Sequence, residues 1–134
     1  MTLTKTPIVR ARDVMHKGII SINGMATAKE AAAKMRAEQV SSLIVEKRHP
    51  DDAWGIIAVQ DLIRDVIISG RSSVDVNVYE IMTKPVIIVP ADMDIRYVAR
   101  LIYRAGIRRA PVEDCGELVG MVALSSLILD NELF

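Results

Sequence analysis

Apolar and polar residues follow two different patterns in the first half of the chain. One pattern predicts β-strands and the other predicts helices. Short apolar runs at residues 19–22, 43–46 and 54–58 have the length of buried β-strands. After the first run, Thr27 and Glu30 have the spacing of a capping box, which satisfies free amides at a helix start. The pattern therefore predicts a strand, a helix and two more strands. A closing helix is predicted from the apolar side formed by Leu62, Ile63, Val66 and Ile67.

The second half of the chain repeats this order. Strands are predicted at 86–89, 110–113 and 117–123, and Asp94 is expected to cap the helix that follows the first of them. Apolar residues recur in this helix at steps of three and four, so they form one face. They are Ile95, Val98, Ala99, Ile102 and Ala105.

The two halves of the chain have the same order of predicted elements because the sequence contains an internal repeat. With a shift of 67 positions, residues 13–46 align without a gap with 80–113. After a loop that is two residues shorter in the second copy, residues 55–63 align with 120–128. Ten of the 43 aligned positions are identical, and most of the remaining core positions exchange one apolar residue for another. Similarity at a fixed offset indicates a duplicated structural unit.

The repeat predicts an α+β fold of two β-α-β-β-α units. We expect the first repeat at 8–68, a small polar linker at 69–77, and the second repeat at 78–134. A unit of this size cannot cover both faces of its own sheet, so the two repeats should pack sheet to sheet with pseudo-twofold symmetry. Such pairing would leave two symmetry-related clefts.

Charge and composition narrow the possible partners and compartments. Seventeen basic residues balance seventeen acidic ones, which argues against a general nucleic-acid binder. No apolar run approaches the length of a membrane span, and the N-terminus lacks the apolar core of a signal peptide. The single cysteine, Cys115, cannot form an internal disulfide. These features predict a cytoplasmic protein with no membrane contact.

Three segments carry a family resemblance: EIMTKPVIIVPADMDI at 80–95, AGIRRAPVED at 105–114 and GIIAVQDLI at 55–63. They resemble cystathionine β-synthase (CBS) domains, here as a tandem pair, or Bateman module, that covers about residues 10 to 130. The resemblance implies a stand-alone regulatory module. Its ligands would be adenosine-containing molecules such as AMP, ADP, ATP or S-adenosylmethionine, bound in the clefts between the repeats.

The ligand motif of the family, Gly-apolar-apolar-Thr/Ser-x-x-Asp, falls on residues 55–61. The resemblance implies that Asp61 accepts hydrogen bonds from the ribose hydroxyls, and that Ala58 and Val59 lie beside the ligand. Ala58 departs from the family pattern, because it stands where a Thr or Ser is usual. One carboxylate can accept from both ribose hydroxyls, with about 1.5–3 kcal/mol for each well-formed charged bond.

The other half of the expected site comes from the second repeat. In related pairs the aspartate of one repeat faces the second strand of the other, which implies that Arg108 and Arg109 contact phosphate. A guanidinium matches two phosphate oxygens at once, so nucleotides rank above the cationic S-adenosylmethionine. Pro111 would provide an apolar wall for adenine. Pro85 and Val86 align with the backbone that usually meets the adenine edge.

The second cleft is expected to be empty or to bind a weaker, less charged ligand. Ser126 stands where its aspartate should be, and Ala123 again replaces the Thr or Ser. Opposite it, Ser41 and Ser42 occupy the positions of the two arginines. We therefore expect one occupied site per chain.

Other interpretations of the same residues are open. Arg108 and Arg109 could be solvated charges or partners of Glu113 and Asp114, and Asp61 could simply stabilise a helix start. The missing hydroxyl positions favour a second hypothesis, in which the protein is a ligand-free interaction scaffold. A sensor of another adenosyl ligand is a further alternative.

No set of residues predicts catalysis. Paired carboxylates, a nucleophile with its base, and a complete metal-ligand set are all missing from the expected clefts, so we expect no enzyme activity and no obligatory cofactor. His49, Asp51 and Asp52 lie close together, but their segment is normal turn chemistry rather than a metal site. The resemblance also implies a homodimer that packs through its helices, with output through an unknown effector protein.

Overall fold

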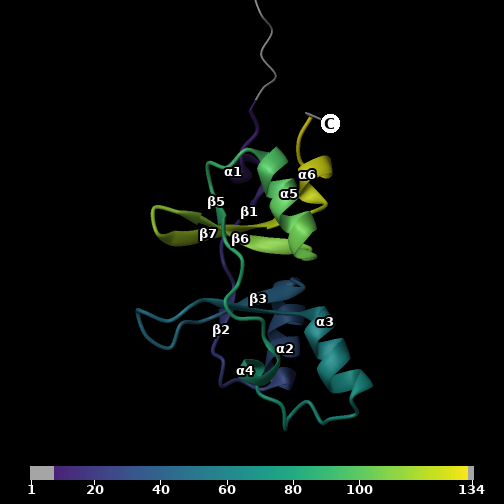
Figure 1. Ribbon diagram of the computed structural model, residues 1–134. Coiled ribbons are helices and arrows are strands. Elements are labelled where there is room, and N and C mark those ends of the chain that lie inside the picture. Colours follow the sequence, from purple (N-terminus) through teal and green to yellow (C-terminus); the bar gives the residue numbers. More distant parts are fainter. Residues whose placement is uncertain (1–7, 133–134) are drawn as a thin grey trace, which may run out of the picture. The chain divides into compact units, whose positions relative to one another are not determined.

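The protein has a mixed α+β fold with two β-sheets, each packed with helices (Figure 1). The computed structural model describes residues 8–132. Within this range the chain forms two compact units. One is Ile20–Val86, and the other combines the described residues before Ile20 with those from Ile87 onward. The prediction of an α+β fold is confirmed.

The unit Ile20–Val86 contains a three-stranded sheet in the order β2-β3-β4. Strand β2 pairs in parallel with β3, and β3 pairs antiparallel with β4. The strands are β2 (Ser21–Ile22), β3 (Ser42–Val45) and β4 (Gly55–Ala58). The helices are α2 (Ala28–Glu38), α3 (Val59–Leu62), the π-helix η1 (Ile63–Ile68) and α4 (Val78–Ile81).

Helix α2 begins where the capping box was predicted. The Thr27 hydroxyl accepts from the Glu30 amide at 3.1 Å, and the Glu30 carboxylate accepts from the Thr27 amide at 3.3 Å. The helix ends at Gln39, which has a left-handed backbone with φ of 56°. The buried face of α2 packs into the core through Ala28, Ala31 and Met35.

The other unit contains a four-stranded sheet in the order β1-β7-β6-β5. Its strands are β1 (His16–Lys17), β5 (Val89–Pro90), β6 (Arg109–Asp114) and β7 (Glu117–Ala123). Its helices are α1 (Ala11–Val14), α5 (Ile95–Ala105) and α6 (Ser126–Leu129). Strand β5 pairs in parallel with β6, while β7 pairs antiparallel with both β6 and β1.

Helix α5 follows its sequence prediction with one exception. Asp94 caps it by accepting from the Arg96 amide at 2.9 Å. Ile95, Val98 and Ile102 are buried against the sheet. Ala105 was expected on this apolar face and is instead exposed. The reason is that the helix ends there, and Gly106 takes a left-handed conformation with φ of 68°.

The two compact units do not coincide with the two sequence repeats. The described residues before Ile20 belong to the first repeat by sequence, yet they pack with residues from Ile87 onward. Residues 78–86 belong to the second repeat, yet they pack within Ile20–Val86. Each repeat therefore contributes its first segment to the unit formed by the rest of the other. The repeat and linker boundaries at 8–68, 69–77 and 78–134 stay a prediction about the sequence.

Equivalent contacts fasten the two exchanged segments. His16 pairs with Met121 between β1 and β7, and Thr83 pairs with Ile56 at the position related by the repeat. At Gly120, a Cβ atom would lie 2.6 Å from the His16 carbonyl oxygen. At the aligned Gly55, it would lie 3.3 Å from the Thr83 carbonyl oxygen. Both glycines permit a backbone approach that a side chain would obstruct.

We expect Gly120→Ala to destabilise the protein by about 1–3 kcal/mol, the usual cost of overpacking a rigid contact. The added methyl group would also lie 2.8 Å from the Met15 sulfur, so both the backbone and a side chain would have to move. Urea denaturation measures the effect. Gly24→Ala is the control, because the nearest atoms to its Cβ lie at an ordinary 3.5 Å. Equal stability of the two variants would contradict the close approach.

Candidate functional site

Asp61 lies at the junction between β4 and α3, with only 12% of its side chain exposed. One carboxylate oxygen accepts from the Ala58 amide at 2.8 Å, and the other accepts from the Arg64 guanidinium at 3.1 Å. The proposed role of Asp61 at a helix start is thus confirmed. Each carboxylate oxygen can accept more than one hydrogen bond, so the cap leaves acceptor capacity for a further donor.

Arg64 is a neighbour that the sequence analysis missed. Its guanidinium bridges Asp61 and Asp65, at 3.1 Å and 2.7 Å. The hydrogen bond from Arg64, together with its charge, lowers the pKa of Asp65 below its ordinary value, and the same hydrogen bond raises the pKa of Arg64. The spacing of Asp61 and Arg64 on one helix could have revealed this pair, because residues three apart are neighbours.

Residues 83–86 run beside the start of β4. The Thr83 amide and carbonyl bond to Ile56 at 2.9 Å each, and the Val86 amide donates to the Trp54 carbonyl at 2.9 Å. The peptide between Lys84 and Pro85 is cis, and Val86 is buried. Pro85 and Val86 therefore lie in the same unit as Asp61. They run beside the start of β4, whereas Asp61 follows the end of β4.

Ala58 and Val59 connect that strand to α3. Ala58 is half-buried at the end of β4, where it pairs with Ser42. Val59 is exposed, and its amide donates to the Ser41 carbonyl at 3.0 Å. The backbone around Asp61 is thus held from β3 as well as from its own side chain.

The two arginines lie at the start of β6, in the other unit. Arg108 is exposed, and Arg109 is half-buried as the first residue of the strand. Burial, together with the neighbouring Arg108 charge, lowers the pKa of Arg109 from its ordinary value. Within residues 8–132, Arg108 forms no ion pair with Glu113 or Asp114. Pro111 is fully buried in the same strand.

The predicted site residues thus fall into two groups. Asp61, Ala58, Val59, Pro85 and Val86 belong to Ile20–Val86. Arg108, Arg109 and Pro111 belong to the other unit, as does the buried Ser126. Their combination in one ligand site stays a prediction.

A second polar centre, which sequence reasoning did not find, lies in the loop between β3 and β4. One Asp52 carboxylate oxygen accepts from the Lys84 ammonium at 2.6 Å and from the Arg48 amide at 2.9 Å. The Arg48 guanidinium lies 3.6 Å from the same oxygen. Mainly through the Lys84 hydrogen bond, the pKa of Asp52 is held well below its usual range. Asp52 thereby ties the loop to the exchanged segment.

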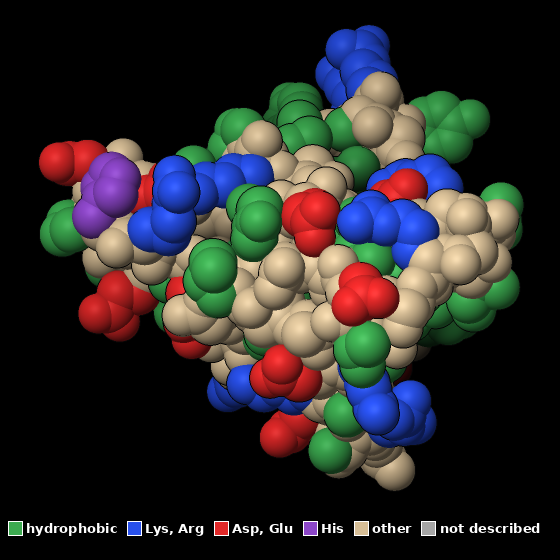
Figure 2. All heavy atoms as spheres, turned by 90° about the horizontal axis from the view of Figure 1, so that it is seen from below, with side chains coloured by type: hydrophobic (Ala, Val, Ile, Leu, Met, Phe, Trp, Pro, Cys, Tyr) green, Lys and Arg blue, Asp and Glu red, His purple; other side chains and the backbone are tan. Residues whose placement is uncertain are grey.

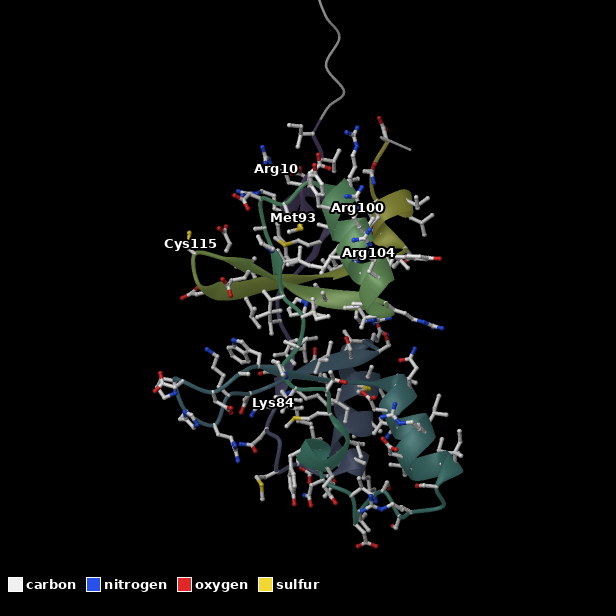
Figure 3. The ribbon with its side chains drawn as sticks, viewed as in Figure 1. Arg10, Lys84, Met93, Arg100, Arg104 and Cys115 are labelled. Carbon is white, nitrogen blue, oxygen red and sulfur yellow. The ribbon has the colours of Figure 1, made fainter. Side chains whose placement is uncertain are left out.

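A hollow of about 630 Å³ opens beside this ion pair, and we call it the Lys84 hollow. Figure 3 marks Lys84 on the ribbon. Residues from three separate segments line the hollow: Asn23, Gly24, Met25, Val45, Glu46, Lys47, Arg48, Asp52, Tyr79, Met82 and Lys84. Acidic, basic and apolar side chains are interspersed on the face of the molecule in Figure 2, without a broad field of one sign.

Comparison with known proteins establishes the class. The sequence pattern that defines the CBS domain matches the chain twice, over residues 11–67 and 78–129. The chain therefore belongs to the CBS domain family and carries a tandem pair of these domains. Such small tandem pairs are generally regulatory modules. Among residues 8–132, no helix combines the length and apolar character needed to cross a bilayer.

Three similar proteins illustrate the family. An uncharacterized protein of Methanopyrus kandleri is 33% identical over 90% of this chain, and the match spans 61% of that relative. A mitochondrial CBS domain-containing protein of Arabidopsis thaliana is 30% identical over 76% of this chain and 51% of its own length. The chain thus spans little more than half the length of these relatives. A hexameric CBS-CP12 protein from bloom-forming cyanobacteria is 35% identical, with a TM-score of 0.87 over 90% of this chain and 67% of its own.

We expect Asp52→Asn to lower the thermal stability at pH 7, because Lys84 and Arg48 would lose their shared carboxylate. The pKa of Asp52 is depressed in the folded state, so its contribution is fully present above the unfolded pKa, about 3.9, and fades as the pH falls toward the folded value. The difference in melting temperature from wild type should therefore shrink below about pH 4. Asp51→Asn, at an exposed neighbour, is the control. A difference that is the same at pH 7 and pH 3 would contradict this role.

Proposed function

We propose that the protein is a regulatory module that binds an adenine nucleotide, AMP, ADP or ATP, between its CBS repeats. The main support is the Asp61 carboxylate, which aligns with the aspartate of the family's ligand motif and is held by the Ala58 amide. A fixed acceptor loses little freedom when a ligand binds, so its hydrogen bonds contribute more to affinity. When a ribose hydroxyl binds Asp61, Arg64 would either give up its hydrogen bond to Asp61 or share that carboxylate oxygen with the hydroxyl.

The paired arginines support a phosphate as the second recognised group. Arg109 is half-buried beside another cation, and both effects disfavour its charge. A guanidinium stays protonated under such conditions. A phosphate matches its charge and its paired donors, which the cationic sulfonium group of S-adenosylmethionine does not.

Regulation would follow from the separation of these groups. Asp61 and the arginines belong to different compact units, so a nucleotide that contacts both would favour one arrangement of the units over others. A ligand shifts such an equilibrium by the difference in its affinity for the two states. The output would pass to an effector protein, with no chemical step in this chain.

Isothermal titration with AMP and with adenosine tests the proposal. Asp61→Ala should weaken both ligands about tenfold or more, because each loses a charged acceptor worth about 1.5–3 kcal/mol. Arg108→Ala and Arg109→Ala should weaken AMP by a similar factor and leave adenosine unchanged. Arg104→Ala, at an exposed position of α5, is the matched control.

Asp61→Asn separates ribose binding from the helix cap, because its amide oxygen can still accept from the Ala58 amide. It should have a melting temperature closer to wild type than Asp61→Ala has, and it should still bind AMP weakly. Nucleotide affinity that is the same in wild type, Asp61→Asn and Asp61→Ala would refute the proposal and favour the scaffold hypothesis.

We also propose that the protein forms a homodimer, and exposed apolar residues support a surface for it. Ile67 and Ile68 in η1 are 73% and 75% exposed, and Ile63 is 42% exposed. Large apolar side chains grouped at a surface favour association. The cyanobacterial CBS-CP12 relative is hexameric, so self-association occurs in a similar protein.

We expect Ile67→Asp to convert the dimer to a monomer in light scattering, because a carboxylate would be buried in an apolar seam. Val74→Asp is the control, since Val74 is 54% exposed but lies in the linker, outside η1. An Ile67→Asp protein with an unchanged mass would exclude η1 from the seam.

A further inference from the structure

The Lys84 hollow draws its walls from three parts of the chain that the fold brings together. Residues 23–25 follow β2, residues 45–48 and Asp52 belong to the end of β3 and its loop, and residues 79–84 belong to α4 and the exchanged segment. All three lie within the unit Ile20–Val86. At about 630 Å³ the hollow falls within the range of small-molecule sites, roughly 300–1,000 Å³.

Part of the lining is apolar and exposed. Met25 is 70% exposed and Tyr79 is 50% exposed, and the lining also includes the apolar residues Val45, which is buried, and Met82. Methionine sulfur and a tyrosine ring both make favourable contacts with aromatic groups, and methionine adapts its shape to the molecule it meets. This wall suits a flat apolar body.

The charged part of the lining has an excess of positive charge. Lys47, Arg48 and Lys84 are balanced only by Glu46 and Asp52, which leaves three charges against two, or +1. Asp52 is already engaged by Lys84 and Arg48. Across the described residues, Lys47 pairs with no carboxylate. Its ammonium lies 5.3 Å from the centre of the Trp54 ring.

We propose that the Lys84 hollow is a second ligand site, selective for a small organic anion with a flat apolar body, such as an aromatic carboxylate or sulfonate. Lys47 supplies the charge that meets the anion, and Met25 and Tyr79 cover the ring. None of Asp61, Ala58, Val59, Pro85 or Val86 lines the hollow, so the site is separate from the expected nucleotide site. It does not depend on nucleotide binding.

Occupation of the hollow would stabilise the exchanged segment. The ligand would touch Tyr79 and Met82 from one repeat together with Met25 and Lys47 from the other, so it joins the pieces of the unit. A ligand that binds only the folded protein raises its melting temperature in proportion to the logarithm of its concentration.

Two probes of one shape test the site in the intact protein: 8-anilinonaphthalene-1-sulfonate and its uncharged analogue N-phenyl-1-naphthylamine. The sulfonate should bind at least about tenfold more tightly than the neutral analogue, a difference of about 1.4 kcal/mol. It should also change the emission of Trp54, the single tryptophan of the chain. Saturating AMP should not displace it.

Single substitutions test whether the two probes bind in the Lys84 hollow. Lys47→Glu should weaken the sulfonate about tenfold or more and leave the neutral analogue unchanged. Lys29→Glu makes the same charge change at an exposed position of the same unit, outside the hollow, and should have no effect. Met25→Asp should weaken both probes, whereas Ile67→Asp should weaken neither.

Three results would overturn the proposal: equal affinity for the two probes, equal effects of Lys47→Glu and Lys29→Glu, or loss of binding in Ile67→Asp. Displacement by AMP would assign the sulfonate to the nucleotide site instead. Because nucleotide titrations of Asp61→Ala are measured separately, failure of one site leaves the other standing.

Discussion

The exchange of first segments between the two repeats depends on close backbone contacts at two related glycines. At Gly120 and Gly55 the carbonyl groups of His16 and Thr83 approach so closely that a Cβ atom would crowd them. These contacts add β1 to one sheet and place residues 83–86 along β4 in the other. Since neither repeat completes its own unit, the two halves of the chain must fold together.

The same exchange places both candidate sites around residues 82–86. Pro85 and Val86 belong to the expected nucleotide site, while Met82 and Lys84 line the hollow. Lys84 is also held by Asp52, so the loop after β3 helps to position the segment.

Duplication has produced units that differ where ligands are expected. Lys17 and Lys84 are aligned in the two repeats, yet Lys17 is exposed on β1 while Lys84 is bound by Asp52. The second repeat has a loop two residues shorter. Its tight turn lies at Cys115 and Gly116 (Figure 3), both with positive φ, and among the described residues no carboxylate forms an ion pair with Lys17. The acidic residue at the helix start is likewise present in one repeat as Asp61 and replaced in the other by Ser126.

The sequence by itself determined the α+β class, the duplication, the caps at Thr27 and Asp94, and the buried face of α5. These features depend on local periodicity and on contacts a few residues apart, which a single chain segment encodes. The Asp61 cap could also be anticipated, because its partner amide is only three residues away. Only the tertiary structure decided that each first segment packs in the other unit, that Asp52 binds Lys84 across 32 positions, and that three segments enclose the hollow. Such pairings depend on where the chain returns in space, and no local pattern in the sequence records that.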